Sequence, residues 1–271
     1  MELTAAAQGL NDFFFGYDSA LLGALHSAAD GVGVVMTPLM KLITLLGEKG
    51  LIFFLLALVF ICFARSRDLG VCIFGAVCCG ALITNIILKD SIARPRPFET
   101  VEQFRQWWVF VGAPMEDGFS FPSGHVTACT AGMTAISLMK GKRWIAPSVI
   151  IVILMGISRN YLMAHYPSDV LVAMVIGAFS GFVAWVITRL IFRFLEEHDH
   201  VPLFALALDF DLGELLPFPV PFLSGESDDR KEAREEPARQ RQSGGHAKAP
   251  AAKKAGVKFS LPSSYKGKHE K

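Results

Sequence analysis

Apolar residues fall in five long runs that contain no charged side chain. These runs cover residues 51–64, 69–88, 121–139, 144–158 and 170–188. A helix needs about 17–25 mainly apolar residues to cross a bilayer, and a soluble core does not need so many uncharged runs of roughly this length. The pattern therefore predicts an all-α, polytopic membrane protein.

The first fifty residues have a weaker pattern. In residues 12–30 apolar side chains recur at helical spacing after three consecutive phenylalanines, which favours an amphipathic helix at the membrane interface. Residues 31–46 are also largely apolar, although Pro38 interrupts them. Together with residues 21–30 they form the weakest of the spans that we expect, in a bundle of about six transmembrane helices.

The composition agrees with this architecture. Of the 271 residues, 52% are hydrophobic and only 19% are charged. These proportions exclude collagen, a disulfide scaffold or a disordered protein as the main architecture. All five cysteines lie in apolar runs, where we expect small hydrophobic side chains rather than a disulfide or zinc framework.

Basic residues in the short loops predict the orientation in the membrane. The loops 65–67 and 140–143 and the region after residue 192 are basic, and all three fall on one side if the spans alternate. Because Lys and Arg accumulate on the cytoplasmic side, loops 89–120 and 159–166 are expected on the opposite side. Loop 89–120 nevertheless carries four cations of its own, which indicates a function for them there.

The chain divides into three parts on this pattern. We expect residues 1–30 to form an interfacial segment, residues 31–195 the membrane domain and residues 196–271 a cytoplasmic tail. From Arg239 onward the tail has nine Lys or Arg against one acid, so it is expected to be mostly disordered, with anionic lipid as a candidate partner. Residues 201–223 give no firm expectation.

Polar residues gather in three segments, each at the end of an expected span on the outer face. They cover residues 89–97, 121–125 and 158–169. Between the second and third segments the chain crosses the membrane twice, in spans of about 17–18 residues at about 1.5 Å rise per residue. The sequence therefore predicts that His125 and His165 lie at one membrane surface.

The residue types in these segments suit a phosphate group. Lys89, Arg96 and Arg159 are cations without a matching number of neighbouring carboxylates. Ser123 and Gly124 stand where a helix begins, so free backbone N–H groups and the helix dipole favour an anion there.

The two histidines add acid–base chemistry. Imidazole titrates near neutrality, so one histidine can act as a nucleophile and the other as a general acid. Asp169 follows His165 by one helical turn, and its carboxylate could bind the second imidazole nitrogen.

The order and spacing of these residues resemble the three-part signature of the type 2 phosphatidic acid phosphatase superfamily. The parts are Lys89-x6-Arg96-Pro97, then Pro122-Ser123-Gly124-His125, then Ser158-Arg159-x5-His165-x3-Asp169. The resemblance covers about residues 31–192. Soluble haloperoxidases that bind vanadate share the signature, but their helices are not lipid-soluble, so the hydropathy of this chain disfavours them.

The resemblance implies a role for each site residue. His165 would attack phosphorus and form a phosphohistidine, Asp169 would orient His165, and His125 would protonate the leaving oxygen and then activate water. The phosphoryl oxygens would be bound by Lys89, Arg96, Ser123, Gly124 and Arg159. Ser158 is expected to pack behind the site, and Arg94, which is outside the signature, has no assigned role.

The expected function is that of a lipid phosphatase or diphosphatase in a bacterial cell membrane, with undecaprenyl diphosphate as the first substrate candidate. The resemblance implies no cofactor and no metal, because the cations already supply positive charge. Phosphatidate or phosphatidylglycerophosphate hydrolysis, and phosphotransfer to another acceptor, are alternatives. A transporter is disfavoured, because the charges collect at one end of the spans rather than at mid-membrane. We expect a phosphorylated lipid as partner and no nucleic acid, and the sequence does not predict the oligomeric state.

Overall fold

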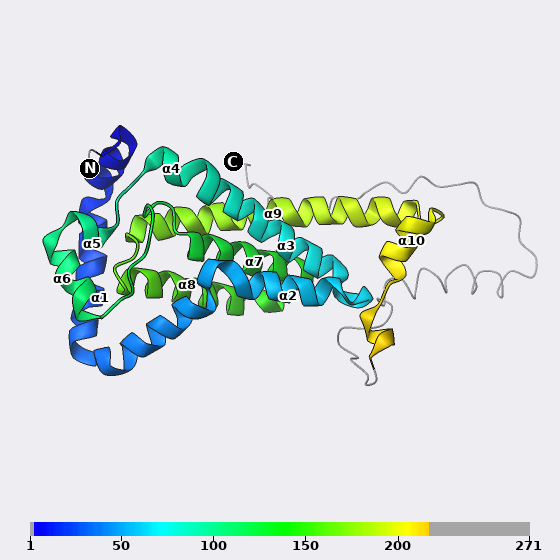
Figure 1. Ribbon diagram of the computed structural model, residues 1–271, viewed down its shortest axis with the longest axis horizontal. Helices are drawn as coiled ribbons and strands as arrows, with labels where there is room; N and C mark the ends of the chain where they lie inside the picture. Colours follow the sequence, from blue (N-terminus) through cyan, green and yellow to red (C-terminus); the bar gives the residue numbers. More distant parts are fainter. Residues whose placement is uncertain (1–2, 217–271) are drawn as a thin grey trace, which may run out of the picture. The chain divides into compact units, whose positions relative to one another are not determined.

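The computed structural model describes residues 3–216 (Figure 1), and every regular element in that part of the chain is helical. The helices are α1 (Ala5–Leu46), α2 (Leu51–Ile61), α3 (Arg67–Ala81), α4 (Lys89–Ile92), α5 (Pro97–Thr100), α6 (Glu102–Phe110), α7 (Gly124–Lys140), α8 (Ile145–Tyr161), α9 (Pro167–Glu197) and α10 (Pro202–Asp209). A π-helical stretch, η3 (Leu82–Leu88), joins α3 to α4, and the short turn η1 (Glu48–Gly50) joins α1 to α2. The expected all-α class is confirmed.

The protein is an integral membrane protein, although the number of six spans is not confirmed. Within residues 3–216, four helical stretches are long and apolar enough to cross a membrane: Ala5–Leu46, Ala64–Thr100, Lys142–Tyr161 and Pro167–Glu197. Within the same residues α2 is apolar but shorter, with 11 residues, and α7 has 17 residues.

The N-terminal region is one bent helix. α1 continues across residue 30, where the sequence suggests a boundary between an interfacial segment and the first span. Its bend lies at Val32, which has non-helical dihedral angles (φ −130°, ψ 19°) and stands between two glycines. Pro38 follows within the helix, and a proline removes one backbone hydrogen bond from the preceding turn. The bend lets α1 contact both α8 and α9.

Small residues bring α7 and α9 close together in the core. A Cβ atom added to Gly177 would lie 2.6 Å from Cβ of Thr130, and one added to Gly181 would lie 2.7 Å from Cβ of Thr134. Small residues four positions apart allow membrane helices to approach in this way. Because α7 and α9 begin at the same end of the bundle (Figure 1), their first turns lie next to each other.

Residues 201–216 fold back onto the connection between α2 and α3. Arg67 donates hydrogen bonds to three backbone carbonyls in this segment, those of Ala207, Leu208 and Phe210. The start of the expected cytoplasmic tail is therefore attached to the membrane helices. The basic region that begins at Arg239 lies outside the described residues.

Candidate active site

The site lies where α7 and α9 begin, α8 ends and the chain leaves α4 for α5. All of the site residues that are predicted from the sequence lie in or next to these four places. Hydrogen bonds and ion pairs connect Arg96, Arg159, His165 and Asp169 through the loop between α6 and α7, as described below. His125 and Lys89 are electrostatic neighbours of Arg159 and of Glu116 in that loop.

His165 has a defined protonation pattern. Its Nδ1 atom lies 2.6 Å from the carbonyl oxygen of Ser120. A carbonyl can only accept a hydrogen bond, so Nδ1 must carry the proton and Nε2 keeps its lone pair. Burial lowers the pKa of His165 well below its ordinary value, and the charges of Arg96 and Arg159 lower it further. A neutral imidazole with a free Nε2 lone pair is the form that can attack phosphorus.

Asp169 is next to His165 but is bonded to other groups. The distance between its Oδ2 atom and Nδ1 of His165 is 3.9 Å, longer than a hydrogen bond. Oδ2 instead accepts hydrogen bonds from the Ser120 hydroxyl and from the backbone N–H of Tyr166, at 3.0 Å for the latter. The sequence expectation that this carboxylate binds the imidazole nitrogen is therefore corrected. The backbone of Ser120 binds the nitrogen, and Asp169 supplies a nearby negative charge.

His125 has a carboxylate partner that the sequence does not reveal. Its Nε2 atom lies 3.4 Å from Oε2 of Glu48, in the turn that follows α1. His125 is mostly buried, whereas the Glu48 side chain is 48% exposed. The Glu48 carboxylate favours the protonated imidazole that a general acid needs, but burial and the positive charge of Arg159 outweigh it and lower the pKa of His125 to about 4.

Arg96 and Arg159 form a buried pair of cations whose charges are bridged by a single carboxylate. Oε2 of Glu116 lies 3.2 Å from Nη1 of Arg96, and Oε1 is paired with Nη2 of Arg159. Burial alone would raise the pKa of Glu116, but the charge and hydrogen bond of Arg159 and the charge of Arg96 lower it to about 2. Glu116 is thus ionised at any physiological pH, and its two oxygens occupy positions that suit two oxygens of a phosphate.

The remaining hydrogen bonds of the Arg96 guanidinium go to the loop between α6 and α7 and to the loop between α8 and α9. Its guanidinium donates to the backbone carbonyls of Asp117, Gly118 and Ala164, at 2.9–3.0 Å. Lys89 approaches the same loop, since a Cβ added to Gly118 would lie 3.9 Å from its Cε atom. Arg96 therefore shapes the loop as well as carrying charge into the site.

Two buried polar atoms at the site have no hydrogen-bond partner. They are the Ser123 hydroxyl oxygen and Nε of Arg159. Ser123 precedes the first residue of α7, where a serine side chain usually bonds to a backbone N–H of the first turn, but here it makes no such bond. Since buried polar atoms are rarely left unpaired, these two atoms indicate a place for an anionic ligand at the N-terminus of α7, beside Gly124.

A cavity of about 400 Å³ adjoins these residues. It is lined by Lys41, Thr44, Leu45, Glu48, Gly112, Pro114 and Leu162. Thr44 accepts a long hydrogen bond from Arg159 (3.5 Å), and Glu48 is the partner of His125, so one wall of the cavity is shared with the site. Thr44 is also bonded to Ser158 (2.9 Å), which is buried as expected of a packing residue.

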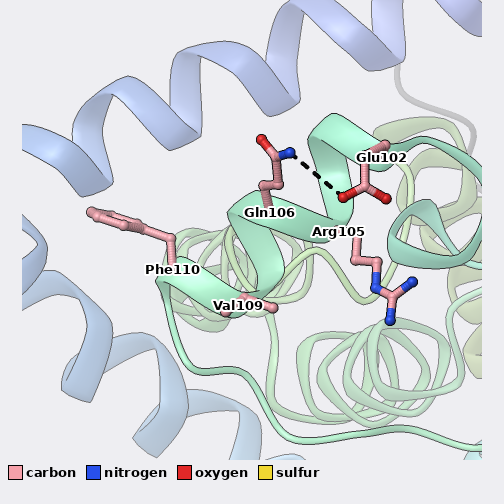
Figure 2. A pocket seen from close by; sticks show the side chains of 5 residues that line it. All are labelled: Glu102, Arg105, Gln106, Val109 and Phe110. Atoms are coloured by element: carbon pink, nitrogen blue, oxygen red, sulfur yellow. Dashed lines mark hydrogen bonds between the residues drawn. The ribbon is translucent and has the colours of Figure 1, made fainter.

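A second depression, of about 370 Å³, lies on α6 (Figure 2). The five side chains that line it are Glu102, Arg105, Gln106, Val109 and Phe110, which all belong to that one helix. It is therefore a feature of the surface of α6 and not a candidate for the active site.

Sequence reasoning missed several residues that complete the site. Glu48 and Glu116 are isolated acids in segments without a motif, and Ser120 acts partly through its backbone. Arg94 is noticeable as a further cation beside the first motif, but its partners are distant in sequence. No group of three or more His, Cys, Asp or Glu residues suited to a metal ion occurs within residues 3–216.

A protein family and several known proteins resemble this chain. The family described as the PAP2 superfamily matches residues 69–193. A lipid A 1-phosphatase of Rhizobium johnstonii is 34% identical over 139 residues, which are 50% of this chain and 54% of that protein. An undecaprenyl-diphosphatase of Sulfolobus acidocaldarius is 27% identical over 45% of this chain and 56% of its own length. A phosphatidylglycerophosphatase B of Haemophilus influenzae is 34% identical over 41% of this chain and 46% of its own length.

The similarity is partial in each case. The chain spans about half the length of these relatives. The matched family region includes every site residue that the sequence selects, from Lys89 to Asp169, but it excludes α1 and η1.

Proposed function

Since residues 69–193 match the PAP2 superfamily, we propose that this protein is an integral membrane phosphatase that hydrolyses a phosphorylated lipid through a phosphohistidine. The observation that carries the proposal is the position of the Glu116 carboxylate. It bridges Arg96 and Arg159, in the same buried group as the neutral His165. A phosphoryl group that displaced this carboxylate would meet both guanidinium groups and the unpartnered Ser123 hydroxyl.

The chemistry takes two steps. In the first, the Nε2 lone pair of His165 forms a bond to phosphorus, the bond from phosphorus to the leaving oxygen breaks, and His125 gives its proton to that oxygen. The phosphohistidine carries positive charge on the ring, which the carbonyl of Ser120 and the nearby Asp169 carboxylate stabilise.

In the second step water replaces the histidine. His125 removes a proton from the water as its oxygen attacks phosphorus, the N–P bond breaks, and inorganic phosphate leaves. His165 is then neutral again, and the proton that His125 gave to the leaving oxygen has been replaced by one from water. Arg96, Arg159, Lys89, Ser123 and the N–H of Gly124 would stabilise the equatorial oxygens in both steps, so the charge is supplied without a metal ion.

For the substrate we propose a lipid diphosphate, with undecaprenyl diphosphate as the first candidate. The leaving group must lie beside His125, and the cavity of about 400 Å³ begins there at Glu48. Lys41 lines that cavity and could bind the phosphate that remains on the lipid. One relative is named for this substrate. Another is named as a phosphatidylglycerophosphatase, which supports a monoester substrate as the second candidate.

A panel of lipids tests the proposal. Purified protein is incubated with undecaprenyl diphosphate, undecaprenyl phosphate, phosphatidate and phosphatidylglycerophosphate, and inorganic phosphate is measured. We expect the fastest release from the diphosphate and none from the His165→Ala variant. Release from no lipid would contradict the proposed hydrolase, and a newly phosphorylated lipid would favour the phosphotransferase alternative.

We also propose that the site faces away from the cytoplasm and that the C-terminus is cytoplasmic, on the basis of the basic loops 65–67 and 140–143. In a background without the native cysteines, a cysteine introduced within residues 99–118 should react with an impermeant thiol reagent on intact cells. A cysteine at Gly244 should react only after lysis. The reverse pattern would place the site in the cytoplasm.

A further inference from the structure

Arg94 is bonded at every nitrogen of its guanidinium and connects α1 to the active site. Nε donates to Oδ1 of Asn11 (2.8 Å), and Nη2 donates to Oδ2 of Asp18 (2.9 Å). Nη1 donates to the Ser168 hydroxyl (2.8 Å) and to Oδ1 of Asp169 (2.5 Å). One cation is thus shared between a carboxylate of the N-terminal helix and the carboxylate beside His165.

Asp18 also binds the first turn of α9 directly. Its Oδ1 accepts a hydrogen bond from the backbone N–H of Ser168 (2.8 Å), and its Oδ2 accepts one from the Ser168 hydroxyl (2.7 Å). A carboxylate at a helix N-terminus satisfies free N–H groups and complements the helix dipole. Because Asp169 is the next residue, Asp18 fixes the backbone from which the Asp169 side chain projects.

All three charged groups are fully withdrawn from solvent. The exposed fractions are 2% for Asp18, 1% for Arg94 and 0% for Asp169. Two carboxylates share one guanidinium, which also lies 3.8 Å from the centre of the Tyr166 ring. Burial of charges is costly unless each is paired, so the three residues depend on one another.

The network determines how Asp169 faces His165. Arg94 is bonded to Oδ1, so that Oδ2 is the oxygen that lies 3.9 Å from Nδ1 of His165. The backbone carbonyl of Arg94 also accepts a hydrogen bond from the N–H of Ser120 (2.7 Å), and Ser120 in turn bonds both Asp169 and His165. Arg94 therefore contacts each of the two groups that orient the nucleophile.

We propose that Asp18 and Arg94 are positioning residues for the phosphoryl-transfer step, acting through Asp169 and Ser120. The active site of this protein is then completed by α1, a helix outside the region that matches the family. This inference rests on the proposed function, because its measurement requires a hydrolysed substrate.

The test is a mutant cycle on the hydrolysis reaction. Asp18→Asn keeps the shape of the side chain and removes its charge. We expect kcat to fall about 10- to 100-fold while KM changes less than about twofold, since the cations that bind phosphate are intact. The rate of phosphohistidine formation in a single turnover should fall by the same factor. Asp12→Asn, an exposed acid on the same helix, is the matched control and should leave both constants unchanged.

The double variant separates positioning from stability. If Asp18 acts through Asp169, Asp18→Asn should cause less than about a twofold further loss in an Asp169→Asn background. Losses that multiply in the double variant would show that Asp18 acts independently of Asp169 and would overturn the inference. An unchanged kcat in Asp18→Asn would overturn it too.

A second variant covers the case in which Asp18→Asn fails to fold. Arg94→Lys keeps the positive charge but cannot reach both carboxylates, so kcat should fall while KM and the melting temperature of the purified protein stay near those of the wild type. If Arg94→Lys instead lowers the melting temperature and retains full kcat, the network is only structural. Failure of the wild-type protein to hydrolyse any lipid of the panel would count against the proposed function rather than against this inference.

Discussion

Two buried charge clusters adjoin His165, and they differ in how completely they are bonded. In the first, which we call the front cluster, Arg96 and Arg159 share Glu116, while the Ser123 hydroxyl and Nε of Arg159 have no partner. In the second, the rear cluster, Asp169, Arg94 and Asp18 have every charged atom paired. The cluster with unpaired atoms is suited to exchanging an anion, and the saturated one is suited to keeping its geometry.

The difference shows that burial and charge alone do not mark a binding site. Both clusters are withdrawn from water and both contain arginine and carboxylate. What separates them is the set of donors that remain available after the protein's own bonds are made. The predictions below test this distinction.

Removal of the nucleophile should have the largest effect, because His165 is the residue that reacts with phosphorus. We expect His165→Ala to lower kcat by several orders of magnitude, since no other group there can form the covalent intermediate. Hydrolysis of the best lipid from the panel measures it, with the melting temperature as a control for folding. A variant that kept a tenth of the wild-type rate would exclude this role.

Removal of the Glu116 carboxylate, which competes with phosphate for the two arginines, should have a smaller effect. It should strengthen the binding of phosphate rather than abolish a function. Glu116→Gln deletes the charge that phosphate must displace, so phosphate should inhibit the variant more strongly, by about three- to tenfold in inhibition constant. Because the pKa of Glu116 is about 2, the carboxylate is charged throughout the usual assay range. The fold increase in inhibition by phosphate, relative to the wild type, should therefore be the same at pH 5 and pH 8.

The matched control for this substitution is Glu102→Gln. Glu102 is exposed on α6 and should leave inhibition by phosphate unchanged. Weaker phosphate inhibition in Glu116→Gln would mean that the carboxylate organises the two arginines rather than competing for them.

Chelation should have the smallest effect. If Lys89, Arg96 and Arg159 supply the positive charge, EDTA should not change the rate of hydrolysis, and orthovanadate should inhibit competitively by binding in the front cluster. Activity that disappears in EDTA and returns with magnesium would show that the front cluster is incomplete without a metal.

The sequence predicts the front cluster better than the rear one. The site residues in the three motifs lie at fixed spacings at the ends of apolar runs, so the periodicity of the spans is enough to bring them to one surface. They include Lys89, Arg96, Ser123, His125, Arg159 and His165. The fold class follows from the same runs. Which helices pair closely depends on small residues such as Gly177 and Gly181, which do not alter an apolar pattern.

Two acids of the site, Asp18 in the rear cluster and Glu48 beside His125, depend on contacts that no local pattern encodes. Asp18 lies 150 residues from Ser168, and Glu48 lies 77 residues from His125. Each is a single acid in a helix or turn, where the usual interpretation is a solvated side chain. Only the docking of α1 onto α8 and α9 makes them part of the site.

The bonds of Arg96 have a consequence for how substitutions are interpreted. Its guanidinium ties down the carbonyls of Asp117 and Gly118, and two residues later the carbonyl of Ser120 decides which imidazole nitrogen of His165 carries the proton. An arginine that faces the substrate thereby also selects the tautomer of the nucleophile. If Arg96 is replaced, the fall in rate would have two causes, weaker binding of the anion and a misplaced proton on His165. The measured fall would therefore overstate the contribution of the Arg96 charge to catalysis.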